Sequence, residues 1–154
     1  MRFDPCGQVI SAVVMFLFCF CVGCGSATEP GPELTPVTGA VSLNDEPLVN
    51  ADLVFIPLEG TPGVGGQART KEAGEFNVIY SRGGEGLPVG TYRVAASYRL
   101  LPDGTPVPEG DTTPPIESPA KETLHRKYSS QDESELRATV SPGTPIELKL
   151  TKKK

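Results

Sequence analysis

The later part of the chain alternates apolar and polar residues over short stretches, and prolines and glycines separate these stretches. Residues 37–43 alternate strictly, which places Val37, Val41 and Leu43 on one face. A period of two residues predicts a β-strand with one buried face. Beyond the first 23 residues, no 12-residue stretch shows the 3.6-residue apolar period of a helix. The pattern predicts seven short strands, at residues 37–43, 51–56, 67–70, 76–80, 91–98, 136–140 and 146–150.

The alternation also predicts which side chains form the core. Leu53 and Phe55 share one face of the second strand and are expected in the core. Val54 and Ile56 on its other face indicate that this side is partly covered. For the fourth and fifth strands, the same reasoning assigns to the core Phe76, Val78 and Tyr80, and Tyr92, Val94, Ala96 and Tyr98.

Turn residues mark the connections. Residues 44–47 have the composition of a tight turn, and Gly74 is expected to take a left-handed conformation. Residues 99–123 hold six prolines and no apolar cluster, so they are predicted to form a long proline-rich loop. A helical turn is expected at residues 124–128. Seven short strands at this spacing indicate an all-β, seven-stranded antiparallel sandwich over residues 37–150.

The first 23 residues have the layout of an export signal. An uninterrupted apolar run extends from Val9 to Val22, and small residues follow it. The run is shorter than the about 20 residues that a membrane-spanning helix needs. We therefore predict a signal helix at residues 1–23 that is removed after export. Residues 24–36, rich in proline, are expected to form a tether, and residues 151–154 a basic tail.

The end of the signal resembles the bacterial lipobox. In Cys21-Val22-Gly23-Cys24, small or aliphatic residues precede the final cysteine, although leucine is usual where Cys21 stands. The resemblance implies cleavage before Cys24 and a diacylglycerol on its thiol, which would anchor the protein to a membrane. The alternative is cleavage after Ala27, which also follows small residues and would release a secreted protein.

Composition restricts the other possibilities. All four cysteines lie at or before Cys24, so the mature domain has no disulfide and no free thiolate. The net charge of −5 and the lack of clustered Lys and Arg outside the C-terminal tail exclude a nucleic-acid partner.

The order of motifs is similar to that of a known family. V-T-G-A-V-S-L-N-D-E-P-L at residues 37–48, T-K-E-A-G-E-F at 70–76 and L-P-V-G-T-Y-R-V at 87–94 resemble a carboxypeptidase regulatory-like domain. The segments H-R-K-Y and E-L-R-A-T-V-S-P-G-T-P-I-E-L-K-L, at 125–128 and 135–150, are similar to the ending of this domain in small lipoproteins of planctomycete-type bacteria.

The resemblance implies a prealbumin-like (transthyretin-like) sandwich. It further implies that Gly39 allows two strands to approach closely, and that Tyr92 packs inward with its hydroxyl on the backbone. Ala73 stands where the family usually has an aspartate, which implies a weaker turn before the following strand.

Candidates for catalysis are few. His125 is the single histidine, and without a second histidine or a thiol it makes neither a metal site nor a catalytic set. The hydroxyisourate hydrolases share the prealbumin-like fold, but they use several histidines and a C-terminal Tyr-Arg-Gly-Ser that this chain lacks. The acidic run at 132–135 is expected to be a solvated turn, with weak calcium binding as the alternative. We predict no enzyme activity, cofactor or metal.

Three functions are compatible with these features. The first is a non-catalytic accessory domain of the cell envelope, anchored through Cys24, that contacts an envelope protein or glycan. An outer-membrane location is preferred, because Gly25 and Ser26 are not the aspartate that retains lipoproteins at the inner membrane. The alternative is a secreted carbohydrate-binding module that stacks sugars on exposed tyrosines. The third is an enzyme with its site in the loop at 99–123.

Overall fold

The computed structural model describes residues 31–114 and 116–152. The predicted signal peptide at 1–23, the predicted lipidation site Cys24, most of the predicted tether and the last two residues of the basic tail lie outside the described residues. Within the described part of the chain, no helix is both long enough and apolar enough to cross a membrane.

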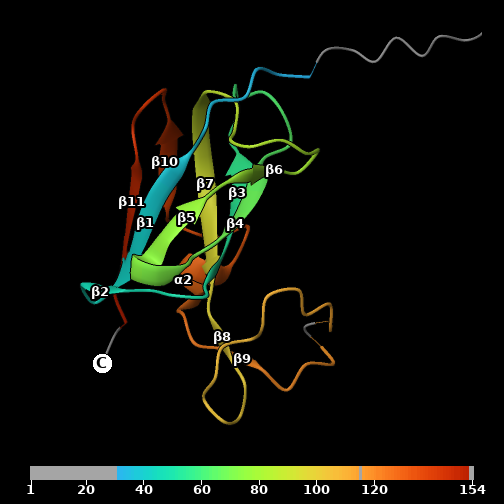
Figure 1. Ribbon diagram of the computed structural model, residues 1–154, viewed down its shortest axis with the longest axis vertical. Coiled ribbons are helices and arrows are strands. Elements are labelled where there is room, and N and C mark those ends of the chain that lie inside the picture. Colours follow the sequence, from blue (N-terminus) through green and yellow to red (C-terminus); the bar gives the residue numbers. More distant parts are fainter. Residues whose placement is uncertain (1–30, 115, 153–154) are drawn as a thin grey trace, which may run out of the picture. The chain divides into compact units, whose positions relative to one another are not determined.

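The front sheet is organised around the first strand (Figure 1). Its members are β1 (Thr38–Leu43), β2 (Glu46–Pro47), β5 (Glu75–Asn77) and β11 (Ile146–Leu150). β11 pairs with β1 along one side, and β2 and β5 pair with different parts of its other side. β1 is therefore the central strand of this sheet.

The back sheet has five strands in the order β10-β7-β3-β4-β6. They are β10 (Arg137–Val140), β7 (Gly90–Ser97), β3 (Asp52–Pro57), β4 (Gly66–Arg69) and β6 (Ile79–Tyr80). All of its pairings are antiparallel. Two short strands, β8 (Arg99–Leu100) and β9 (Lys121–Glu122), form a separate ribbon. The helical segments are η1 (Glu72–Gly74) and α2 (Arg126–Ser129).

Each of the seven predicted strands has a counterpart in the structure, but one orientation was predicted wrongly. β1 and β11 run parallel, with Gly39 opposite Ile146 and Leu43 opposite Leu150, so the sandwich is not wholly antiparallel. Side chains alternate with a period of two in both kinds of pairing, and the sequence pattern therefore carries no information on orientation. The predicted strand at 76–80 is also divided, because β5 belongs to the front sheet and β6 to the back sheet.

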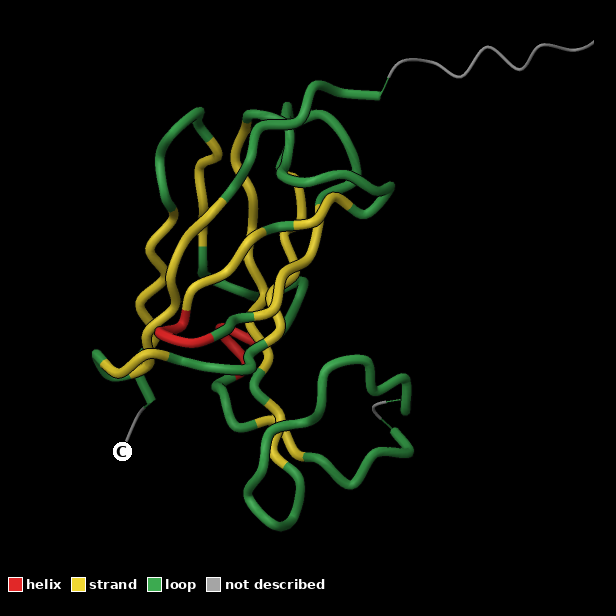
Figure 2. The backbone as a smooth tube through the Cα atoms, viewed as in Figure 1, coloured by secondary structure: helices red, strands yellow, loops and turns green. Residues whose placement is uncertain are grey.

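The core is one cluster of buried side chains that come from both sheets, whose strands are drawn in yellow in Figure 2. The side chains predicted to be buried are buried, except that Leu43 and Tyr98 are only partly covered. Phe55 is at its centre, with ring centroids 5.9 Å from Phe76 and 6.4 Å from Tyr92. The tyrosine expectation is confirmed, since Tyr92 is fully buried and its hydroxyl donates to the Pro88 carbonyl oxygen at 2.8 Å.

Gly39 marks a close approach in the front sheet, as expected. A Cβ at this position would lie 2.1 Å from the Ile146 carbonyl oxygen and 2.6 Å from the Phe76 ring. Both distances are far below van der Waals contact, so only glycine fits here.

The turn before β5 is strained in the way that the family resemblance implies. Gly74 has a φ of +72°, which confirms its predicted left-handed conformation, and Ala73 has a φ of +59°. Asp and Asn tolerate this region better than alanine. Ala73 therefore weakens a turn that an aspartate would accommodate with less strain.

The sandwich begins earlier in the chain than the sequence indicated. The Thr35 amide donates to the Leu87 carbonyl oxygen at 2.8 Å, and the Leu87 amide donates back to Thr35 at 2.9 Å. Leu34 packs against the core. The last residues of the predicted tether are thus attached to the domain, at the end where β1 and β7 begin.

The proline-rich loop extends from the other end of the sandwich. β7 continues into β8, and the described part of the segment between β8 and β9, which we call the excursion (residues 101–114 and 116–120), projects beyond the two sheets (Figure 1). The attachment of Thr35 and the excursion are therefore at opposite ends of the domain.

Candidate functional site

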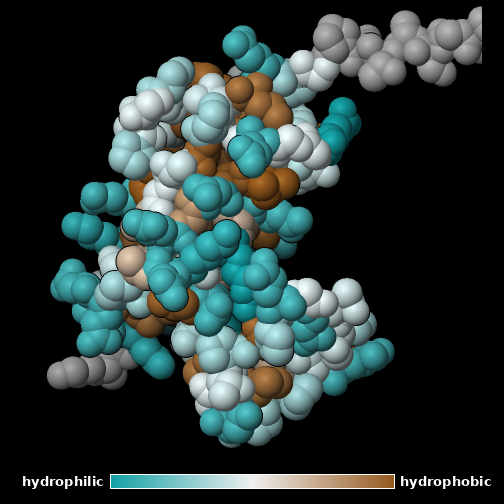
Figure 3. Space-filling view, viewed as in Figure 1, coloured by the Kyte–Doolittle hydropathy of each residue, from teal (hydrophilic) through white to brown (hydrophobic). Residues whose placement is uncertain are grey.

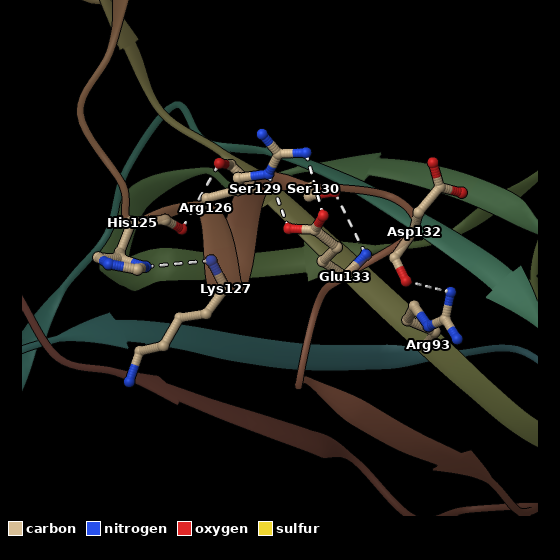
Figure 4. A network of polar contacts seen from close by, with 8 residues as sticks. All are labelled: Arg93, His125, Arg126, Lys127, Ser129, Ser130, Asp132 and Glu133. Carbon is tan, nitrogen blue, oxygen red and sulfur yellow. Dashed lines mark hydrogen bonds and ion pairs between the residues drawn. The ribbon is translucent and has the colours of Figure 1, made fainter.

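The single histidine has a structural role. His125 is exposed, precedes α2, and its Nδ1 accepts a hydrogen bond from the Lys127 amide at 3.2 Å (Figure 4). This is the position of a helix N-cap, whose acceptor satisfies one of the amides at the helix start. Among the described residues, no three His, Cys, Asp or Glu side chains gather as metal ligands would.

The acidic run at 132–135 fastens α2 to the back sheet. Glu133 pairs with Arg126, whose Nε and Nη2 donate at 2.7 and 3.0 Å. The Asp132 carbonyl oxygen accepts from Arg93 of β7 at 2.7 Å (Figure 4). Ser134 is buried, and its hydroxyl donates to the Val94 carbonyl oxygen. The carboxylates are exposed, as expected of a solvated turn, but this turn also covers part of β7.

The tyrosines are not arranged for stacking on sugars. Tyr80, Tyr92 and Tyr128 are buried in the core, and Tyr98 is half-buried. The Tyr128 hydroxyl is 3.1 Å from Thr151 Oγ1, which further withdraws this side chain from solvent contacts. The exposed aromatic pair that would favour the carbohydrate-binding alternative does not occur in the described part of the chain.

A groove lies between the outer face of the back sheet and the excursion, with a volume of about 590 Å³. Because Leu53 and Phe55 point into the core, the alternate residues of β3 point outward. The groove floor consists of Asp52 and Val54 from β3, Gln67 and Arg69 from β4, and Ile79 from β6.

The strand register arranges these floor residues in two rows. In one row Val54 lies opposite Gln67, which in turn lies opposite Ile79. In the other row Asp52 lies opposite Arg69. The first row therefore places one exposed amide between two aliphatic side chains, and the second row is an ion pair.

Arg69 attaches the excursion to the sheet. Its Nη1 donates to Asp52 Oδ1 at 2.8 Å, and its Nη2 donates to the carbonyl oxygen of Val107 in the excursion. The Arg69 side chain is only 16% exposed, while Asp52 is 53% exposed. One guanidinium thus bridges the floor and the wall, because its two terminal nitrogens donate to different acceptors.

The wall of the groove is formed by residues 107–111 and 113 of the excursion. The Val107 amide donates to the Arg99 carbonyl oxygen at 3.2 Å, and this hydrogen bond attaches the wall to β8. Hydrogen bonds from Thr113 lower the pKa of Asp111, and the nearby charge of Arg99 acts in the same direction. Cationic and anionic side chains both line the groove, so it attracts neither sign of charge strongly.

The groove is suited to an extended chain with polar backbone groups. The Gln67 amide can donate and accept at once, as a peptide group requires. Val54 and Ile79 on either side offer apolar contact, and Ile79 is 45% exposed. None of the lining residues is aromatic. On the face seen in Figure 3, hydrophilic residues predominate and apolar residues form separate patches.

Sequence reasoning did not identify Asp52, Gln67 or Arg69 as site residues. Each is an ordinary polar residue on the outer face of a predicted strand, and only the pairing of β3, β4 and β6 brings them together. The proline content of residues 99–123 was the one available signal, because long loops without regular structure are often functional.

Comparison of the chain with family models, with curated proteins and with solved structures finds no match. The family resemblance therefore rests on the motifs and on the β-rich fold.

Proposed function

We propose that this chain is a non-catalytic, lipid-anchored interaction domain of the cell envelope, built as a prealbumin-like sandwich of the carboxypeptidase regulatory-like type. In this proposal Cys24 carries the lipid, the protein is exported, and the outer membrane is its preferred location. The groove beside the excursion binds an extended segment of an envelope protein.

The placement of the two ends of the domain is the observation that supports this proposal most. Thr35 pairs with Leu87, close to the start of β7, and the excursion follows the end of β7. β7 has eight residues, which at about 3.3 Å each extend roughly 26 Å. The chain therefore enters the domain at one end of β7, and the excursion and its groove lie at the other end of β7.

The non-catalytic part of the proposal is supported by the structural hydrogen bonds and ion pairs that the polar side chains make. His125 caps α2, Glu133 pairs with Arg126, and Ser134 bonds to the backbone of β7. A hydrolase would need a base held by a third group near a nucleophile. These side chains instead hold the segment at 124–136 on the sandwich.

The groove supports a protein partner over a glycan. Sugar-binding sites usually stack the ring on an exposed aromatic side chain, and the lining residues include none. The Val54, Gln67 and Ile79 row offers what an extended peptide uses, namely one amide and apolar contacts on both sides.

The anchor is tested by the intact mass of the protein purified from its native membrane. We expect a mature chain that begins at Cys24 and carries a diacyl or triacyl mass, and we expect Cys24→Ala to abolish both the mass increment and membrane retention. A wild-type chain without lipid that begins near Thr28 would refute the lipid anchor at Cys24 and favour the secreted alternative.

The groove is tested by placing a photo-crosslinking residue at Gln67 in the anchored protein. Thr139 on β10 is the matched control, because it is also exposed and lies on the outer face at the opposite edge of the same sheet. We expect a protein adduct from position 67 in the native envelope and none from position 139. Equal labelling at both positions would show that the groove is not the contact surface.

A further inference from the structure

One lateral edge of the front sheet has no neighbouring strand in the described part of the chain. β11 pairs with β1 along one side, and no described strand pairs with its other side. An uncovered strand edge carries backbone amides and carbonyls that can pair with another chain. The residues of β11 whose backbone amides and carbonyls point away from β1 determine which partner sequence and register can pair with this edge.

Three hydrogen bonds identify these outward-pointing groups. The Leu150 carbonyl oxygen accepts from the Asn44 amide at 2.9 Å, and the Lys152 amide donates to Asn44 Oδ1 at 2.9 Å, so residues 150 and 152 face the β1 side. The Thr151 amide donates instead to the Tyr128 hydroxyl at 3.3 Å. Backbone groups alternate along a strand, and Glu147 and Lys149 therefore point their amides and carbonyls away from β1.

The side chains of the same two residues carry opposite charges. Ile146, Leu148 and Leu150 are buried in the core, whereas Glu147 and Lys149 are exposed on the outer face. Neither charged side chain forms an ion pair with another described residue. The free edge thus presents one acid and one base, two positions apart and on one face.

We propose that two copies of this chain pair antiparallel through β11, with the two-fold axis at Leu148. Glu147 then lies opposite Lys149 of the second copy, and Lys149 lies opposite its Glu147. Because both residues direct their backbone groups outward, each facing pair exchanges two hydrogen bonds. The Cβ atoms of directly opposite residues in an antiparallel pair are about 5 Å apart, so each carboxylate lies beside an ammonium group.

Neighbouring registers are disfavoured by the same residues. An axis at Glu147 places the two acids opposite each other and brings Lys149 to Pro145, which has no amide hydrogen. An axis at Lys149 places two bases opposite each other and uses the Thr151 amide, which is already bonded to Tyr128. A lone lysine usually protects a strand edge from pairing with another chain. Of these three registers, only the one centred on Leu148 places Glu147 opposite Lys149, so that the lysine charge is neutralised.

The test is sedimentation equilibrium of the full chain in density-matched detergent. We expect a concentration-dependent dimer that weakens with added salt. Glu147→Lys and Lys149→Glu should each weaken dimerisation about tenfold or more, because each places like charges opposite one another in both pairs. The double reversal Glu147→Lys/Lys149→Glu restores complementarity and should restore the dimer. Glu59→Lys, an equal charge change at an exposed loop position outside the front sheet, should leave dimerisation unchanged.

A carbodiimide, which joins a carboxylate directly to an adjacent amine, tests the register itself. In a mixture of unlabelled and ¹⁵N-labelled chains, a mixed-label peptide linking Glu147 to Lys149 is expected. Wild-type protein that stays monomeric at every concentration would overturn the proposal, and a dimer unaffected by the reversals would overturn the β11 interface. Thermal unfolding of each variant distinguishes lost association from lost folding.

Discussion

Tyr92 connects the stability of the sandwich to alkaline pH. The side chain is fully buried, and its hydroxyl donates to the Pro88 carbonyl oxygen at 2.8 Å. Burial raises the pKa of Tyr92 to about 12, and the neighbouring Tyr80 adds to this increase. The phenol is consequently protonated in the folded protein at pH values where a tyrosine of the unfolded chain, with a pKa of about 10, is ionised.

The sign of the effect follows from this difference. Since the folded pKa is the higher one, the contribution of Tyr92 is fully present below pH 10 and is lost as the pH rises from 10 towards 12. The difference between the two pKa values corresponds to roughly 2–3 kcal/mol of unfolding free energy. Tyr92→Phe removes this titration and also the hydrogen bond to Pro88, which costs about 1–2 kcal/mol at pH 8.

The assay is urea unfolding of wild type and Tyr92→Phe, followed by far-UV circular dichroism from pH 8 to 11.5. We expect the variant to be less stable at pH 8 and the gap to narrow steadily above pH 10. Tyr98→Phe, which removes a phenol that is only half-buried, serves as the control for general alkaline effects. Wild-type and Tyr92→Phe stabilities that fall in parallel across this range would refute the reasoning.

Three further predictions concern packing and are measured by the free energy of urea unfolding. Gly39→Ala should destabilise the folded domain by about 2–3 kcal/mol because the new Cβ meets the Ile146 backbone. Gly31→Ala is the control and should be neutral, because a Cβ there has no neighbour within 4 Å. Equal effects of the two substitutions would contradict the close approach of the strands at Gly39. Phe55→Ala should cost about 3–5 kcal/mol, enough to unfold a small domain, and a cooperative melt near the wild-type temperature would contradict its central position. Ala73→Gly should stabilise by about 1 kcal/mol by relieving the positive φ, and a loss of stability would show that the turn is not strained.

Residue patterns along the chain predicted most of the sandwich. Alternation located the seven strands and the inward faces of β3 and β7, because a strand with one covered face must alternate. The structural roles of Gly39 and Tyr92 followed from the family resemblance, and the steric and hydrogen-bonding surroundings of both residues agree with them.

The features that escaped prediction depend on contacts between distant segments. The groove depends on the hydrogen bond from Arg69 of β4 to the Val107 carbonyl oxygen in the excursion, and no local sequence pattern predicts this contact. The orientation of β11 beside β1 is equally invisible, because alternation is the same in either direction. The bridge between Thr35 and Leu87 was missed because the surrounding prolines and glutamate have the composition of a linker.

The parallel pairing of β1 with β11 imposes an order on folding. Asn44 at the end of β1 bonds to Lys152, 108 positions later, and β1 is the central strand of its sheet. Closing a loop of that length costs on the order of 4 kcal/mol of chain entropy before its contacts form. The back sheet contains no β11 and can assemble first, whereas the front sheet stays incomplete until the final strand arrives. A chain that emerges from its N-terminus must therefore leave one hydrogen-bonding edge of β1 without its strand partner until nearly all of the chain has been delivered, and we expect completion of the front sheet to be the slow step of maturation.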